Sequence, residues 1–397
     1  MEHRKLSLQL LVLHVLNDGF LVSLPLLLPF IKETLSLSLG QIGMFGGALH
    51  VMSVVMALPA AEIAHRLGGM RSLLWGLLTV GLGFLLVGIG QAPMWVGLAF
   101  VIAGCGFGIF HPVAFSLLAQ QTQRENRGAA MANFTAVGDV GRIILAAIVT
   151  YLAVRLGWRW TSLLFGLAAV IISSLIGLKS YSVSKSVNVD DHSLKGIPEI
   201  LKSRAFLLAM TAFTLDTLAS SGLFIFLPFV LLAKQIDPTV LGAMAGFYFV
   251  GNIVGKVTIG NAVDRYGYRL VISTAEVFMA ILLVMLALAQ SWGVIAIISL
   301  LLGTVTKGTV PALTTLISDA VPDQKWFQAA FSVNAVVTGI AATLAPVMYG
   351  LLADKIGVNQ VLYVNAALAA IVLIPLAFLG PGPAASTPKS IESPRLI

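Results

Sequence analysis

The stretch Gly260-Asn-Ala-Val-Asp264-Arg265-Tyr-Gly267-Tyr-Arg269 is a polar turn, marked by glycine, between two long apolar runs. Weaker copies of this turn occur at His65-Arg66-Leu-Gly68, Val154-Arg155-Leu-Gly157 and Asp354-Lys355-Ile-Gly357. Their glycines are evenly spaced, because positions 68 and 157 are 89 apart, 267 and 357 are 90 apart, and 68 and 267 are 199 apart. This spacing indicates a repeat of a quarter of the chain nested within a repeat of half the chain.

The composition places the chain in a lipid bilayer. Of its 397 residues 58% are hydrophobic and only 10% are charged, and the mean hydropathy is +0.96. Soluble domains carry about 25% charged residues. The net charge of +7 comes from bases in short turns between apolar runs, which favours orientation in a membrane over nucleic-acid binding. The single cysteine, Cys105, excludes an internal disulfide.

Apolar runs long enough to cross a bilayer predict twelve membrane helices and an all-α fold. The predicted spans are 8–31, 41–64, 72–90, 93–119, 129–154, 159–178, 205–232, 240–262, 271–290, 292–318, 328–352 and 360–379. They form an N-terminal six-helix bundle (1–178) and a C-terminal six-helix bundle (205–380), joined by a charged cytoplasmic linker (179–204). A proline-rich tail (381–397) is predicted to be disordered. The first span interrupts its apolar run with Asn17 and Asp18, so we interpret it as a membrane helix and not a signal peptide.

The distribution of bases predicts the orientation of the helices. With the N-terminus inside, the inner loops and tails hold 16 Lys and Arg residues and the outer loops hold five. Positive charge collects on the cytoplasmic side, so both termini are expected there, in the cytoplasmic (inner) membrane.

The half-chain offset also relates individual residues. Asp18 corresponds to Asp216, Pro112 to Pro311, and Arg66 to Arg265. Two equivalent halves, each made of inverted three-helix units, are typical of secondary transporters. Twelve spans, the central loop and Gly260-x-x-x-Asp264-Arg265-x-Gly267-x-Arg269 resemble the major facilitator superfamily over essentially the whole chain. The resemblance implies two pseudo-symmetric six-helix bundles that work by alternating access.

The sequence departs from that family in two places. The first-half copy of the signature has Ala61 in place of its leading glycine and His65 in place of its aspartate. The fifth span carries Gly138-Asp139-Val-Gly141-Arg142 where many exporters of the family have a glycine-proline motif. Two other motifs, Leu13-His14-x-x-Asn17-Asp18 and Gly106-x-Gly108-x-x-His111-Pro112, resemble exporters of the fosmidomycin-resistance type.

Six charged residues are predicted to lie at membrane depth: Asp18, Asp139, Arg142, Asp216, Lys256 and Lys307. Each costs about 2.5–3.5 kcal/mol against lipid on insertion scales, so together they would cost on the order of 15–20 kcal/mol. We therefore expect them to face one another or a wet cavity between the bundles.

We expect three of the membrane-embedded groups to handle protons: Asp18, His14 one helical turn before it, and Asp216. Arg142, Lys307, Lys256, His111, His50 and Asp139 are the candidates for substrate binding. Lys307 precedes Pro311, where we expect unwound, cavity-lining helix. Glu276 is expected to pair with a base of an inner loop.

The family resemblance implies a cytoplasmic gate formed by His65, Arg66, Arg71, Asp264, Arg265 and Arg269. Arg265 and Arg269 are expected to bridge the two bundles, with Asp264 at a helix N-terminus. Replacement of the aspartate by His65 predicts a weaker and pH-sensitive first latch.

The sequence thus predicts a monomeric secondary transporter of a small, anionic organic solute, coupled to protons and working in efflux. No cofactor, metal or catalytic constellation is expected. Three alternatives stay open: uptake of an organic anion by symport or facilitated diffusion, export of a metal ion or cationic drug by way of the aspartates, and a membrane sensor or lipid-processing enzyme on the same scaffold.

Overall fold

The computed structural model describes residues 2–123, 127–179, 196–323 and 326–379. Within these residues, twelve helical segments are long and apolar enough to cross a membrane. They agree with the predicted spans to within a few residues at most ends. Most of the predicted linker and all of the predicted tail lie outside the described residues.

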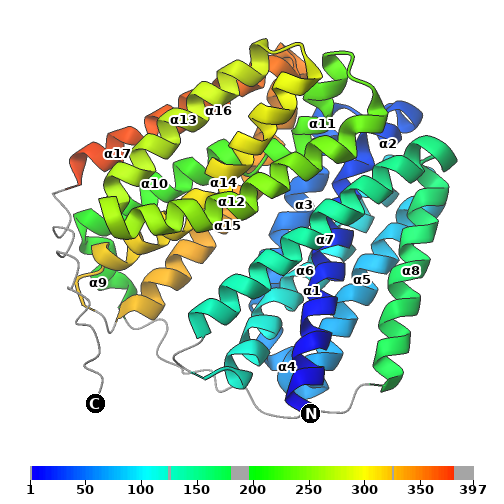
Figure 1. The fold of residues 1–397 in the computed structure, drawn as a ribbon, viewed down its shortest axis with the longest axis horizontal. Helices are drawn as coiled ribbons and strands as arrows, with labels where there is room; N and C mark the ends of the chain where they lie inside the picture. The colour runs from blue at the N-terminus through cyan, green and yellow to red at the C-terminus, as the bar shows by residue number, and fades with distance from the viewer. Residues whose placement is uncertain (1, 124–126, 180–195, 324–325, 380–397) are drawn as a thin grey trace, which may run out of the picture.

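The first half of the chain forms one helical bundle, from blue to green in Figure 1. Its helices are α1 (Glu2–Leu26), α2 (Leu28–Leu35), α3 (Leu39–Ala57), α4 (Ala60–Leu67), α5 (Gly69–Ile89), α6 (Pro93–Gln121), α7 (Arg127–Leu156) and α8 (Trp158–Lys179). The first span is made of α1 and α2, which meet at Leu27 shortly after Pro25. The second predicted span, 41–64, is in fact interrupted, since α3 ends before Pro59 and α4 follows it.

The second half forms the other bundle, from green to red in Figure 1. It contains α9 (Ile197–Lys202), α10 (Arg204–Ser220), α11 (Leu223–Ala233), the short 3-10 helix η2 (Pro238–Val240), α12 (Leu241–Tyr266), α13 (Tyr268–Leu288), α14 (Trp292–Ala320), α15 (Phe327–Ile356), α16 (Val358–Ile371) and α17 (Leu373–Phe378). The short helix α9 lies in the segment predicted as a linker, and it packs against α10 and α15.

The four glycines that mark the repeat occupy equivalent places in the fold. Gly68, Gly157, Gly267 and Gly357 have φ angles of 87°, 80°, 78° and 91°. Each separates two antiparallel helices of neighbouring spans. A positive φ is a conformation that residues with a Cβ rarely adopt, so glycine allows the sharp reversal at each position. The internal repeat inferred from spacing is therefore also a repeat of backbone conformation.

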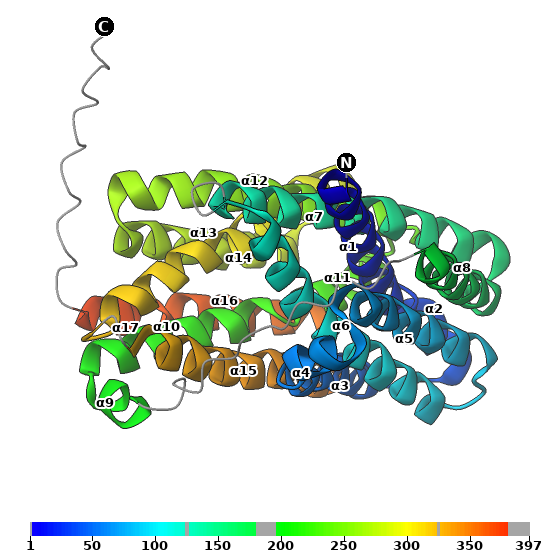
Figure 2. The same cartoon turned by 90° about the horizontal axis from the view of Figure 1, so that it is seen from below.

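The two bundles lie side by side and touch through α3 with α15 and α7 with α12 (Figures 1 and 2). At the first interface the backbones approach closely. A methyl group added to Gly43 would overlap the carbonyl of Pro346, and one added to Gly350 would overlap the carbonyl of Leu39. Small residues permit this approach, which gives dispersion contacts where lipid supplies no hydrophobic driving force.

A carboxylate of the second bundle caps a helix of the first. Asp354 near the end of α15 accepts hydrogen bonds from the backbone N–H groups of Leu39 and Gly40, both 2.8 Å long. These groups begin α3 and have no partner within their own helix. The negative charge also interacts favourably with the positive end of the helix dipole. Asp354 therefore clamps the two bundles together at this end of the molecule.

At the opposite end of the molecule, the hydrogen bonds given for the signature loops stay within one bundle. Figure 1 shows the bundles diverging towards the end where the N-terminus lies. Among the described side chains of the signature loops, Arg66 pairs with Glu62 of its own helix at 2.5 Å and Arg269 donates to the carbonyl of Ala377 at 3.3 Å. The molecule is thus closed at the Asp354 end, with the signature loops apart.

Asp354→Ala is expected to loosen the closed end, because the start of α3 then loses both of its partners from the other bundle. A helix cap of this kind contributes about 1 kcal/mol. Spin labels at the exposed positions Glu33 and Lys355 should report a longer and broader distance distribution by pulsed electron paramagnetic resonance. Asp237→Ala is the matched control, since Asp237 caps η2 within its own bundle. An unchanged distribution in Asp354→Ala would refute the clamp.

Candidate functional site

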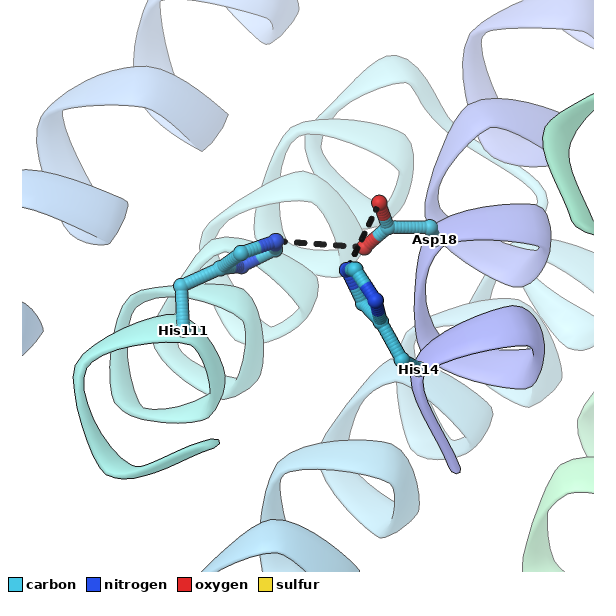
Figure 3. A group of neighbouring side chains, drawn as sticks. All are labelled: His14, Asp18 and His111. Carbon is cyan, nitrogen blue, oxygen red and sulfur yellow. Dashed lines mark ion pairs between the residues drawn. The ribbon is translucent and has the colours of Figure 1, made fainter. Parts of the chain in front are cut away.

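Asp18 is the centre of a buried polar cluster (Figure 3). It lies on α1 with a relative exposure of 2%. Its Oδ2 accepts a hydrogen bond from Arg142 Nη2 at 2.7 Å, and its Oδ1 accepts one from Asn17 Nδ2 at 3.1 Å. His14 Nε2 lies 3.3 Å from Oδ2, and His111 Nε2 on α6 lies 3.4 Å from Oδ1. Three helices of the first bundle thus converge on one carboxylate.

The hydrogen bond on the far side of His14 fixes its tautomer. Nδ1 lies 2.8 Å from the carbonyl oxygen of Phe134, which can only accept, so Nδ1 carries the proton. A neutral His14 then turns the bare Nε2 lone pair towards the carboxylate of Asp18. A second proton, on the imidazole or on the carboxyl group, converts this contact into a hydrogen bond.

The same network continues into the second bundle. Arg142 Nη1 donates to Asp139 Oδ1 at 2.9 Å, and Lys256 Nζ on α12 donates to Asp139 Oδ2 at 2.5 Å. Asp139 is completely buried between these two cations. We call the series Asp18–Arg142–Asp139–Lys256 the ion chain. Its two acids and two bases balance, which removes most of the cost of placing charge at membrane depth.

His14, Asp18 and His111 are candidate ligands for a metal ion. Their donor atoms lie within 4.8 Å of one another, and imidazole and carboxylate are common ligands of divalent metals. However, the Arg142 guanidinium already lies against Asp18, and a divalent cation would compete with it for the same oxygen. A proton adds to an imidazole without displacing Arg142. The cluster fits a proton better than a metal ion.

A central cavity of about 150 Å³ lies beside the ion chain, between the two bundles. The first bundle lines it with residues of α1, α3, α6 and α7, and the second with residues of α10, α11, α12 and α14. The lining residues are Leu21, Val22, Pro25, Gly46, Leu49, His50, Phe100, Arg142, Ser220, Ser221, Phe224, Ile225, Tyr248, Phe249, Asn252 and Lys307. A cavity shared by both halves near mid-membrane is where a transporter of this architecture binds its substrate.

Three basic side chains line this cavity, those of Arg142, Lys307 and His50. No carboxylate is among the lining residues. Arg142 also lies over the ring of Phe249, 5.8 Å from its centroid. Lys307 has no ion-pair partner among the described residues, in contrast to Arg142 and Lys256. The cavity thus offers positive charge that is not fully neutralised.

Asn252 is a cavity residue that sequence reasoning passed over. Its side chain is 1% exposed and lines the cavity, and neither its Nδ2 nor its Oδ1 has a hydrogen-bond partner among the described residues. A buried amide without partners is costly. The sequence signal that could have identified Asn252 is its position in a membrane-spanning helix, one turn before the candidate Lys256. The amide can donate to and accept from a bound molecule.

A second buried acidic group lies deeper in the C-terminal bundle. Asp216 on α10 is 2% exposed and accepts a hydrogen bond from Thr309 Oγ1 on α14 at 3.1 Å. Glu276 on α13 is completely buried, and neither of its carboxyl oxygens has a hydrogen-bond partner among the described residues. The expectation that Glu276 pairs with an inner-loop base was wrong, because its helix turns it into the bundle.

The structure divides the predicted substrate-binding residues into two groups. Arg142, Lys307 and His50 line the cavity. Lys256, Asp139 and His111 do not line it; they lie in or beside the ion chain behind it. The predicted unwinding near Pro311 is also absent, since α14 is one continuous helix from Trp292 to Ala320. Lys307 reaches the cavity from a regular helix.

The predicted gate residues lie at the end where the bundles diverge. His65, Arg66 and Arg71 are exposed, and Arg66 holds the pKa of Glu62 below its usual value through a hydrogen bond. Arg265 lies over the ring of Tyr266 of its own bundle. Asp264 is in the last turn of α12 and not at a helix N-terminus, and its side chain is outside the described set. Among the described residues, neither Arg265 nor Arg269 forms the expected bridge to the other bundle in this conformation.

Comparison with known proteins assigns the family. The model of the Major Facilitator Superfamily matches residues 10–233 and again 209–396. The chain belongs to this superfamily and is a membrane transporter of the twelve-helix type. The quinolone resistance protein NorB of Staphylococcus aureus, strains JH9 and Newman, is 20% identical over 268 residues. That match covers 62% of this chain and 58% of NorB, so the chain spans little more than half of this curated relative.

Solved structures show the same fold at low sequence identity. A bacterial homolog of the human lysosomal transporter Spinster, in an inward-facing and occupied conformation, has a TM-score of 0.75 at 14% identity. The alignment covers 96% of this chain and 97% of that one. The nucleoside transporter NupG has a TM-score of 0.79 at 14% identity, covering 95% and 100%.

Removing the cation at one end of the ion chain should destabilise the protein. Neutralising the acid that it pairs with should restore most of the stability. Lys256→Met leaves the buried Asp139 with one cation instead of two and should lower the apparent melting temperature of the purified protein. Removing one partner of a buried pair costs about 3–5 kcal/mol. The double variant Lys256→Met with Asp139→Asn is neutral again and should recover most of the loss. Equal destabilisation in the single and double variants would show that the pair is not coupled.

Proposed function

We propose that this protein carries a small organic anion across the membrane through the central cavity, coupled to protons. The observation that supports this most directly is the basic lining, in which Arg142, Lys307 and His50 face a space without a carboxylate. Arg and Lys side chains suit carboxylate, phosphate and phosphonate groups, and Arg binds them with two parallel hydrogen bonds. Phe100, Phe224 and Phe249 complete the lining and suit an apolar body attached to the charged group.

Alternating access follows from how the cavity is built. Residues of both bundles line it, and the contacts at the Asp354 end close one side of it. Rocking one bundle against the other exchanges these contacts for contacts at the signature loops. The buried substrate site then faces each side of the membrane in turn. We further propose that both termini are cytoplasmic, in the inner membrane, on the basis of the Lys and Arg distribution.

The ion chain supplies the link between protons and the anion. A proton on Asp18 or His14 weakens the hold of Asp18 on Arg142, which lines the cavity. The ion chain then carries a net positive charge, and the cavity attracts an anion more strongly. Linkage is reciprocal, so a bound anion favours proton uptake to the same extent. This arrangement favours movement of the anion and the proton in the same direction.

A second candidate is proton-coupled efflux, and the relatives favour it. The curated relatives are named for quinolone resistance. Proteoliposomes distinguish the two candidates once an anion has been identified. Cotransport predicts that an inward proton gradient fills the vesicles with the anion, and exchange predicts that the same gradient empties them. The export of a metal ion or a cationic drug is disfavoured, because Asp18 and Asp139 are occupied by fixed cations.

The substrate class can be tested by ligand-induced stabilisation of the purified protein. A panel of carboxylates, phosphates and phosphonates should raise the melting temperature, and a panel of divalent metals and cationic drugs should not. A ligand at one hundred times its Kd stabilises by about 2.7 kcal/mol. Lys307→Ala should abolish the response, because it removes the unpaired cation of the cavity.

Lys234→Ala is the matched control, since Lys234 donates to the carbonyl of Ala287 and does not line the cavity. It should keep the full response to the same anions. Stabilisation by cations alone, or an undiminished response to anions in Lys307→Ala, would refute an anion site.

A further inference from the structure

Asn252 on α12 is a buried amide that lines the central cavity without a partner among the described residues. Its side chain is 1% exposed, and neither Nδ2 nor Oδ1 forms a hydrogen bond with any of them. The amide carries two N–H donors and a carbonyl acceptor, and burying such groups unpaired is costly. Packing within the protein therefore does not account for an asparagine at this position.

The polar side chains one turn away on the same helix are already engaged. Tyr248 Oη shares a hydrogen bond of 2.8 Å with Thr306 Oγ1, and Lys256 Nζ donates to Asp139 Oδ2 at 2.5 Å. Neither neighbour can turn to Asn252 without giving up the partner that it has. The amide thus has no substitute partner on its own face of α12.

Backbone contacts keep α12 from rotating the amide towards another part of the protein. A methyl group added to Gly251 would overlap the carbonyl oxygen of Leu300 on α14, and one added to Gly255 would overlap that of Thr304. The two glycines lie on either side of Asn252 along the helix, and they let α12 and α14 pack backbone against backbone. The position of Asn252 in the cavity wall is therefore fixed by this packing.

The same wall holds a cation of the proposed anion site. Phe249 precedes Asn252 by three residues, which places both on one face of α12. Arg142 lies over the ring of Phe249, 5.8 Å from its centroid, and all three residues line the cavity. The cavity volume of about 150 Å³ is that of a space which holds a molecule the size of benzene. A small anion that meets Arg142 is therefore also close to Asn252.

We propose that Asn252 is a specificity-determining residue, which selects an anion that carries a carboxamide group on a short apolar link. The carbonyl of such a group accepts from Nδ2 while its N–H donates to Oδ1, so one planar group pairs both ends of the Asn252 amide. A carboxylate in the same place can only accept, and an alkyl group pairs with neither end. This inference rests on the proposed anion site and adds the second group by which the substrate is recognised.

Matched pairs of anions test this selection. Succinamate and levulinate differ only in an amide NH2 group against a methyl group, and a second pair carries a phosphonate in place of the carboxylate. Wild-type protein should bind the carboxamide of each pair at least about tenfold more tightly, as read from the concentration dependence of the melting temperature. Asn252→Leu should bind both members of a pair equally, because the amide that distinguishes them has been removed.

Asn365→Leu is the matched control for the probe response. Asn365 is a buried asparagine of α16 that does not belong to the cavity lining. This variant should keep the wild-type preference for the carboxamide. Loss of the preference in both variants would trace it to a general change of the fold and would count against Asn252.

The melting temperature without any probe gives a second readout, which a structural role would move the other way. Asn252→Leu replaces an unpaired buried amide by an apolar side chain, so it should melt a few degrees above the wild-type protein. An amide that the fold itself needs would make the same variant melt lower.

Either of two results would overturn the proposal and leave the anion site in place. Equal binding of the carboxamide and the methyl ketone by wild-type protein would mean that Asn252 does not recognise the substrate. A lower melting temperature of Asn252→Leu without a probe would mean that the amide serves the fold. Binding of neither pair would instead remove the proposed anion site, and the selection with it.

Discussion

The structure depends on neutralising fixed charge within a medium that does not solvate it. Asp18, Arg142, Asp139 and Lys256 do this for one another in an alternating series of contacts between 2.5 and 2.9 Å. Each acid alone would cost several kcal/mol at membrane depth, and each pair offsets most of that cost. Because the series begins on α1 and ends on α12, neutrality of either bundle requires the other. The charges therefore hold together the two bodies that must move during transport.

In the proposed function, the same requirement would let a proton act on the substrate-binding site. The ion chain is balanced as it stands, so any added proton leaves it with a positive charge. That charge arises at Arg142, which is at once the partner of Asp18 and part of the cavity wall. The tautomer of His14, set by the carbonyl of Phe134, turns an unprotonated nitrogen towards the same carboxylate. Proton binding and anion binding thus act on one guanidinium group.

The closed end of the molecule shows a different way of joining the bundles. There the contact is made by backbone, through glycines that let α3 approach α15, and by Asp354 on the first N–H groups of α3. Such contacts form or break together as two surfaces separate, because they depend on close approach. The central acids Asp18 and Asp139 are buried in this conformation. In the proposed alternating access, the bundles would rock about the central charges while the clamp at one end separates.

Much of the fold could be predicted from the sequence, because its determinants are local or periodic. Hydropathy gives the twelve spans, and the spacing of Gly68, Gly157, Gly267 and Gly357 gives the repeat, since each reversal requires a positive φ. The need to shield buried charge predicts that Asp18, Arg142 and Lys256 avoid lipid, and they do. Which charge meets which depends on helix rotation and packing, and no spacing rule gives that. Only the tertiary structure decided that Lys256 pairs with Asp139, that Glu276 is buried in its bundle, and that Lys307 lines the cavity without an ion-pair partner among the described residues.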